Sequence, residues 1–182
     1  MTTLIVGLGN PGPEYISTRH NIGFLALDRL REVFDAPAFQ SDAKFFADLS
    51  SVVTGGEKII FAKPTTYMNE SGRSVRAILD YYKLDTNALI VIHDDLDITP
   101  GTLRTTDSSR AAGHNGVQDI IDCLGTQDFF RIRLGIGRPV EVEDGCMPSH
   151  DYVLGRFSVE ETAGHPALFD EVIGIVRKRL GT

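Results

Sequence analysis

Residues 4–8 limit what this chain can fold into more than any other stretch. They are apolar at consecutive rather than alternate positions, which is typical of a strand that is buried on both faces of a sheet. Gly7 and Gly9 interrupt this run, and Asn10 ends it before the turn Pro11-Gly12. The sequence therefore predicts a central strand that delivers polar side chains to the rim of a sheet.

Further strand-like segments follow along the chain. They alternate with period two, or are apolar and rich in β-branched residues, and they lie at residues 45–53, 58–62, 88–92 and 131–136. Gly55-Gly56 separates the first two segments, which predicts a β-hairpin. The segment 88–92 predicts a second buried strand, and residues 138–150 have the composition of a loop.

Segments with apolar residues at helical spacing separate these strands. They begin near Asn21, Ser71 and Gly116, and a last one covers residues 169–180. Asn21 and Ser71 are residue types that commonly cap a helix, so we expect both to be N-caps. The alternation predicts an α/β fold whose mixed sheet is flanked by helices, in a single domain over residues 1–182.

Composition and charge narrow the classes of function. The 182 residues are 42% hydrophobic and 24% charged, and the net charge is −7, so a polyanion would have to bind a local basic patch. Cys123 and Cys146 have neither metal-site nor disulfide-framework spacing, which favours a reducing compartment. The sequence shows no signal peptide and no apolar stretch of about 20 residues, so we expect a cytoplasmic protein without a membrane partner.

Polar residues at the ends of the apolar segments form a candidate site. Asn10 and His20 follow the first strand, Asp94 follows a later one, and Asn69 and Asn115 lie in loops that can reach the same rim. A carboxylate can fix the tautomer of a histidine, which then accepts a proton from water. Asparagine amides can orient that water or donate to an oxyanion. The pattern indicates a hydrolytic site without a side-chain nucleophile.

Each of these residues also has an ordinary structural explanation. A histidine such as His20 can lie at the surface or cap a helix, carboxylates often end a strand in solvent, and asparagine beside glycine is common in turns. Metal ligation is a further alternative, because several residues of suitable type lie close in sequence: His93, Asp94, Asp95, Asp97 and His114. Adjacent Asp94 and Asp95 would point to opposite faces if extended, which weakens that alternative.

A glycine-rich loop opens another alternative. Gly7, Gly9 and Gly12 match the G-x-G-x-x-G pattern of nucleotide-binding loops. However, prolines follow instead of the immediate helix whose N-terminus would hold a pyrophosphate. No G-x-S-x-G sequence is present, which disfavours a serine hydrolase. A non-catalytic RNA-binding module remains a third possibility beside a hydrolase and a nucleotide-binding enzyme.

Motifs along nearly the whole chain, taken in order, resemble those of the bacterial peptidyl-tRNA hydrolase family. They are residues 6–12 (VGLGNPG) with Tyr15, 18–23 (TRHNIG), 63–72 (KPTTYMNESG), 93–97 (HDDLD) with Pro100-Gly101, 113–116 (GHNG), 130–137 (FRIRLGIG) and 151–154 (DYVL). The resemblance implies an aminoacyl-tRNA hydrolase, a carboxylic ester hydrolase of translation. Such an enzyme cleaves the ester between tRNA and a peptide or N-blocked amino acid, and so recycles tRNA from prematurely released peptidyl-tRNA.

The resemblance also implies roles for particular residues. By position, His20 is the general base, Asp94 orients it, and Asn10 holds peptide and water. The substrate would be bound by Tyr15, Tyr67, Met68, Asn69, Asn115 and Arg133, with Tyr67 and Met68 lining a peptide channel and Arg133 contacting tRNA phosphate. The implied partner is peptidyl-tRNA, through its acceptor stem and peptide, and not DNA. The family implies a monomer that needs no metal or organic cofactor.

One segment departs from the family pattern. Residues 108–112 read SSRAA where relatives usually carry glycines, and their Cβ atoms restrict the backbone. Thr106 stands where a basic residue is common. Arg110 is the expected replacement for that missing charge.

Overall fold

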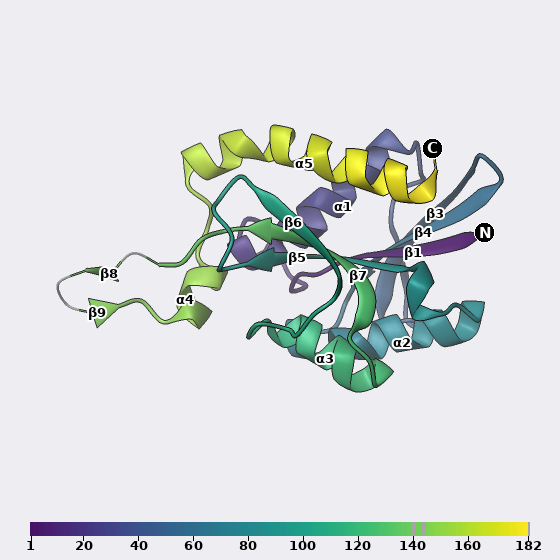
Figure 1. Cartoon of the computed structure of the whole chain (residues 1–182), viewed down its shortest axis with the longest axis horizontal. Helices are drawn as coiled ribbons and strands as arrows, with labels where there is room; N and C mark the ends of the chain where they lie inside the picture. Colours follow the sequence, from purple (N-terminus) through teal and green to yellow (C-terminus); the bar gives the residue numbers. More distant parts are fainter. Residues whose placement is uncertain (140, 143–144, 182) are drawn as a thin grey trace.

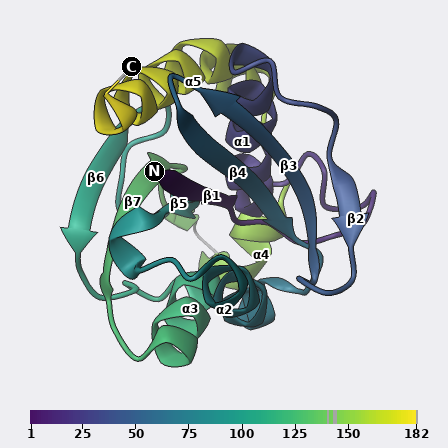
Figure 2. The same ribbon diagram turned by 90° about the vertical axis from the view of Figure 1, so that its right-hand side faces the viewer.

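The computed structural model describes residues 1–139, 141–142 and 145–181. Seven of its strands form one sheet: β1 (Thr2–Gly7), β2 (Gln40–Asp42), β3 (Ala47–Thr54), β4 (Glu57–Pro64), β5 (Leu89–Asp95), β6 (Leu103–Ser108) and β7 (Asp128–Gly135). Their order is β2-β3-β4-β1-β5-β7-β6. Figure 1 shows the whole chain, and the strand order can be followed from right to left in Figure 2. The four central strands β4, β1, β5 and β7 are parallel, and the outer strands pair antiparallel. The predicted mixed sheet is therefore confirmed.

The strand β1 lies at the centre of this sheet between β4 and β5. Leu4, Ile5 and Val6 are completely buried, with Ile5 in the core on one face and Leu4 and Val6 in the core on the other. The consecutive apolar residues are explained by this double burial. The predicted hairpin is also present as β3 and β4, and its turn has Gly55 and Gly56 at φ of 57° and 79°, which glycine adopts easily.

Helices cover both faces of the sheet. They are α1 (Ile22–Val33), α2 (Ser71–Tyr82), α3 (Asn115–Leu124), α4 (Ser149–Leu154) and α5 (Val159–Leu180), with 3₁₀ turns η1 (Arg19–Asn21), η2 (Met68–Glu70) and η3 (Thr86–Ala88). Figure 2 shows α1 and α5 on one face and α2 and α3 on the other. No helix within the described part of the chain is long and apolar enough to cross a membrane.

Of the two predicted caps, Asn21 is confirmed by position and Ser71 is not. Asn21 stands at the N-cap of α1, but its side chain bonds to the main chain of Asn10 instead of capping the helix. Ser71 is the first residue of α2, and its hydroxyl donates to the Met68 carbonyl oxygen at 2.8 Å. The local sequence indicated residue types that commonly cap helices. In the structure, however, their side chains form hydrogen bonds with other main-chain groups.

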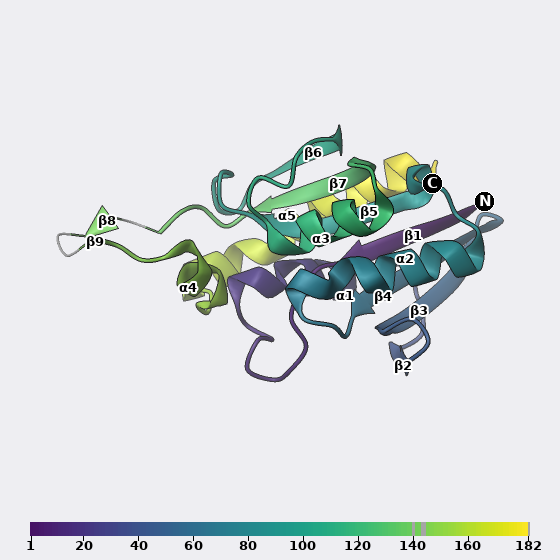
Figure 3. The same ribbon diagram turned by 90° about the horizontal axis from the view of Figure 1, so that it is seen from below.

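The segment 138–150 is not only a loop. Two short strands, β8 (Glu141–Val142) and β9 (Gly145–Cys146), pair antiparallel and project beyond the sheet, and α4 follows them (Figure 3). The last helix is longer than predicted because it begins at Val159, where Ser158 and Glu161 form a capping box. Cys123 is an exposed free thiol, and the side chain of Cys146 lies outside the described part of the structure.

Candidate active site

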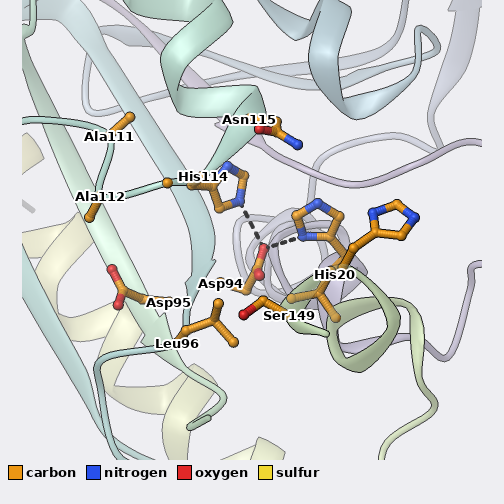
Figure 4. A pocket seen from close by; sticks show the side chains of 12 residues that line it. His20, Asp94, Asp95, Leu96, Ala111, Ala112, His114, Asn115 and Ser149 are labelled. Carbon is orange, nitrogen blue, oxygen red and sulfur yellow. Dashed lines mark hydrogen bonds and ion pairs between the residues drawn. The ribbon is translucent and has the colours of Figure 1, made fainter. Parts of the chain in front are cut away.

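A cavity of about 130 Å³ lies at the carboxyl end of β5. The residues that line it come from η1, the end of β5, the turn before α3, and α4: His20, Asp94, Asp95, Leu96, Ala111, Ala112, Gly113, His114, Asn115, Ser149, His150 and Val153 (Figure 4). Ligands of α/β proteins collect at this edge, where the strands stop and their loops converge. Of the five residues that the sequence predicts at one rim, the cavity brings together His20, Asp94 and Asn115, whereas Asn10 and Asn69 are not among its described lining residues.

Asp94 joins two histidines that line this cavity. Its Oδ1 atom accepts hydrogen bonds from His20 Nδ1 and from His114 Nε2, each at 2.9 Å (Figure 4). Only 3% of the Asp94 side chain is exposed. A buried carboxylate needs such partners, because water no longer solvates its charge.

The tautomer of His114 follows from its place in the fold. His114 is the N-cap of α3, and its Nδ1 atom accepts a hydrogen bond from the Val117 main-chain N–H at 3.2 Å. A neutral imidazole that accepts through Nδ1 carries its proton on Nε2, which is the nitrogen facing Asp94. The helix cap therefore makes His114 a donor to Asp94. The sequence suggested His114 only as a possible metal ligand. Its position just before a predicted helix is the signal that could have indicated a capping role.

The pKa values of this cluster favour a proton acceptor at His20. Burial lowers the pKa of His20, but the Asp94 charge and hydrogen bond raise it more, so it lies above the ordinary 6.5. Burial raises the pKa of Asp94, while His20 and His114 lower it more, and the carboxyl stays ionised. His20 Nδ1 donates to Asp94, so the Nε2 lone pair of neutral His20 remains available for a proton.

Asn10 is held by a second set of hydrogen bonds. Its Oδ1 atom accepts from the Met68 main-chain N–H at 2.8 Å. The Asn21 amide spans the Asn10 main chain, accepting from its N–H and donating to its carbonyl oxygen, both at 2.9 Å. Within the described residues the Asn10 Nδ2 group has no protein partner, so it is oriented and able to donate. Sequence reasoning missed this role of Asn21, which was expected to cap α1.

The other predicted site residues lie outside the described lining of this cavity. Tyr67 and Asn69 are exposed on the loop around η2, and Tyr15 is half-buried. The Met68 side chain is only 4% exposed and belongs to the hydrophobic core. Arg133 Nε donates to Asp95 Oδ2 at 2.8 Å. None of these five is among the described residues that line the cavity, so their substrate contacts stay predictions.

The metal alternative fits this geometry poorly. His20, Asp94 and His114 present one ligand atom each within 4.8 Å of one another, a spacing that a metal ion can bridge. However, the ligand atom of His114 is Nε2, whose lone pair is absent while Nδ1 accepts from Val117. A metal would have to break the cap of α3 to bind there. The cluster is better suited to proton transfer.

The glycine loop also has a structural explanation. No helix starts directly after β1, because η1 begins only at Arg19. A Cβ on Gly7 would come within 2.4 Å of the Gly23 carbonyl oxygen, and one on Gly9 within 2.7 Å of the Phe24 ring. These glycines let α1 pack closely on β1. The pyrophosphate-binding interpretation is therefore not supported by the fold.

Comparisons with known proteins show which family the chain resembles. The peptidyl-tRNA hydrolase family model matches residues 4–181. A peptidyl-tRNA hydrolase of Bacillus cereus is 51% identical over 161 residues, covering 88% of this chain and 83% of that protein.

Solved structures of peptidyl-tRNA hydrolases have the same architecture. One from Acinetobacter baumannii superposes with a TM-score of 0.87 at 34% identity, covering 97% of this chain and 87% of its own. A complex of peptidyl-tRNA hydrolase with N-propanol gives a TM-score of 0.89 at 33% identity, with coverage of 99% and 89%. With the family model spanning nearly all residues, the chain belongs to the peptidyl-tRNA hydrolase family.

Proposed function

We propose that this protein hydrolyses the ester bond between tRNA and a peptide or N-blocked amino acid, with His20 as the general base. The observation that carries the proposal is the pair of hydrogen bonds on Asp94 Oδ1. They hold an ionised carboxylate against His20 Nδ1 and leave its Nε2 atom free to accept a proton. A single domain of residues 1–182 would carry this activity in the cytoplasm, where translation produces the substrate.

Water is the nucleophile in this mechanism. His20 Nε2 takes a proton as the water oxygen bonds to the ester carbonyl carbon, and Asp94 stabilises the imidazolium that forms. The tetrahedral intermediate then collapses with cleavage of the bond to the ribose oxygen. His20 returns the proton to that oxygen, which restores the base and releases peptide and tRNA.

Asparagine amides would position the substrate. Asn10 Nδ2 is oriented by the Met68 hydrogen bond and is suited to donate to a peptide carbonyl or the developing oxyanion. Asn115 lines the cavity beside His20 and is suited to place the water (Figure 4). Asn69 and Tyr67 would contact the peptide from the η2 loop. Met68 contributes through its main-chain N–H, since its side chain is buried.

The acceptor stem of tRNA would bind outside this cavity. Arg133 is the cation to which the family resemblance assigns a phosphate contact, and 21% of its side chain is exposed beside Asp95. Tyr15 lies on the loop between β1 and η1 and would complete the substrate site. We propose that the protein acts as a monomer, since the base, its carboxylate and the amides all come from one chain.

The test is release of peptide from an N-acetyl-aminoacyl-tRNA by the purified protein, with EDTA present. His20→Ala should lose turnover by roughly 10² to 10⁴, while tRNA binding persists because no phosphate contact is removed. His165→Ala is the matched control, since His165 lies on α5, packs against the Phe157 ring and is not among the described residues that line the cavity. Near-normal turnover in His20→Ala would defeat the proposed function.

A further inference from the structure

Arg19 belongs to the same short turn as His20, yet the proton transfer above does not use it. Its guanidinium makes two hydrogen bonds to one carboxylate: Nε to Glu161 Oε1 and Nη2 to Glu161 Oε2, both at 2.8 Å. These residues are 142 positions apart in the chain. Their side chains are 15% and 17% exposed. A two-pronged pair of this kind restricts orientation as well as distance.

The same guanidinium also contacts α4. It lies over the Tyr152 ring at 4.3 Å from the ring centre, and Nη1 donates to the Tyr152 carbonyl oxygen at 3.4 Å. The Tyr152 hydroxyl in turn donates to the Ile136 carbonyl oxygen at 2.7 Å, just after β7 ends. The residue Tyr152 is thus held between the sheet and Arg19.

Main-chain bonds join the turn of His20 to the segment after α4. Arg19 N–H donates to the Gly155 carbonyl oxygen at 3.0 Å, and Phe157 N–H donates to the Ser17 carbonyl oxygen at 3.2 Å. Thr18 and Arg156 form an isolated antiparallel bridge between these bonds. The Arg19 side chain therefore fastens two segments that already touch through their backbones.

The helix α4 matters because it forms one wall of the cavity. Ser149, His150 and Val153 line the same cavity as Asp94 and His114. The position of α4 relative to His20 sets the room left for the ester and the water. A six-residue helix has little stability of its own, so its contacts with the rest of the protein decide where it lies.

We propose that Arg19 is a positioning residue for the hydrolysis: it holds α4 against the turn that carries His20 and so keeps the cavity in its reactive shape. This inference rests on the proposed function, because it concerns the same cavity. It assigns no chemical step to Arg19. Lysine cannot replace the planar fork that binds Glu161 on one side and Tyr152 on the other.

The experiment compares Arg19→Lys with wild type in hydrolysis of an N-acetyl-aminoacyl-tRNA, well below the melting temperature of both. Loss of the fork should lower kcat/KM by about 10- to 10²-fold, since displacement of groups around a reactive site is costly. The acid limb of the pH profile should stay in place, because the positive charge beside His20 is kept. Amide hydrogen exchange in α4 should become faster.

Two companion variants make the test specific. Glu161→Gln should reproduce the loss, and the double variant should be little worse than either single one, because both remove the same interaction. Arg76→Lys is the matched control: Arg76 pairs with Asp80 at 2.9 Å on the exposed side of α2, with both side chains more than half exposed. Its kcat/KM should equal that of wild type.

Three results would overturn the inference. One is kcat/KM within a few-fold of wild type in Arg19→Lys and Glu161→Gln, whatever happens to the melting temperature. Another is a shifted acid limb with an unchanged plateau, which would mean that Arg19 acts through its charge on His20. The third is unchanged exchange in α4. His20→Ala, measured in parallel, reports on the proposed function itself, since only that variant removes the base.

Discussion

Asp94 and Asp95 are neighbours on β5, and their side chains are 3% and 7% exposed, but their surroundings differ. Asp94 accepts from two imidazoles, His20 and His114. Asp95 accepts from the Arg133 guanidinium at 2.8 Å and from the Asp97 main-chain N–H at 2.9 Å. Consecutive residues of a strand point to opposite faces, so the two carboxylates have different partners although both line the cavity.

The difference lies in whether the partner can release a proton near neutral pH. Imidazole exchanges its proton in that range, whereas guanidinium stays charged. The Asp94 cluster can therefore take part in a reaction, while the Asp95 pair remains an ion pair that orients Arg133. The two similarly buried carboxylates are thus suited to different tasks: Asp94 to assisting proton transfer and Asp95 to holding a cation.

The largest expected effect is on the rate of hydrolysis, and it distinguishes Asp94 from Asp95. Asp94→Ala should lower kcat by roughly 10² to 10⁴, since His20 loses the group that fixes its tautomer and stabilises its charged form. Asp95→Ala should leave kcat within a few-fold of wild type. Single-turnover hydrolysis at saturating enzyme measures both. Equal losses in the two variants would show that the comparison does not describe the chemistry.

A smaller effect concerns pH. The Asp94 carboxylate raises the pKa of His20, and only neutral His20 accepts a proton, so activity rises with pH through that pKa. Asp94→Asn removes the charge, and the acid limb of kcat/KM should move to lower pH, beneath a reduced plateau. Asp95→Asn is the control and should keep the limb in place. A limb that stays fixed in Asp94→Asn would contradict the assignment of His20 as the titrating base.

The role of Arg133 gives a test in binding rather than rate. Arg133→Ala should weaken binding of tRNA and reduce the slope of log affinity against log salt by about 1, because one phosphate contact is lost. Filter binding over a salt series gives this slope. Arg76→Ala, which removes an exposed cation from α2, should leave the slope unchanged. An unchanged slope in Arg133→Ala would exclude a phosphate contact at that residue.

The smallest expected effect concerns Arg110, which sequence comparison with the family suggested as a substitute for a missing cation at Thr106. The structure shows Arg110 exposed, with its carbonyl oxygen accepting from Arg131 at 3.3 Å. Arg110→Ala should lower tRNA affinity a few-fold and reduce the salt slope. If both stay at wild-type values, the substitution idea is wrong.

Much of the fold was predictable because a buried strand or helix has a recognisable pattern of apolar residues in the local sequence. The run over residues 4–8 indicated a strand covered on both faces, and β1 is such a strand. The placement of His20 and Asp94 at one rim followed from the rule that the carboxyl ends of parallel strands converge. Competing partners changed other details: Asn21 stands at the N-cap of α1 as predicted, but its side-chain amide binds the Asn10 main chain instead of the helix.

The amino-acid sequence by itself determined the α/β class, the central strand, and the residue types for a water-activating site. Only the tertiary structure decided that His114 shares Asp94 with His20, that Asn21 orients Asn10, and that Arg19 reaches Glu161. The physical reason is the separation along the chain of the residues that interact. Periodicity and turn chemistry act between near neighbours in the chain. Hydrogen bonds between side chains such as Arg19 and Glu161, 142 residues apart, exist only after the sheet and helices have packed.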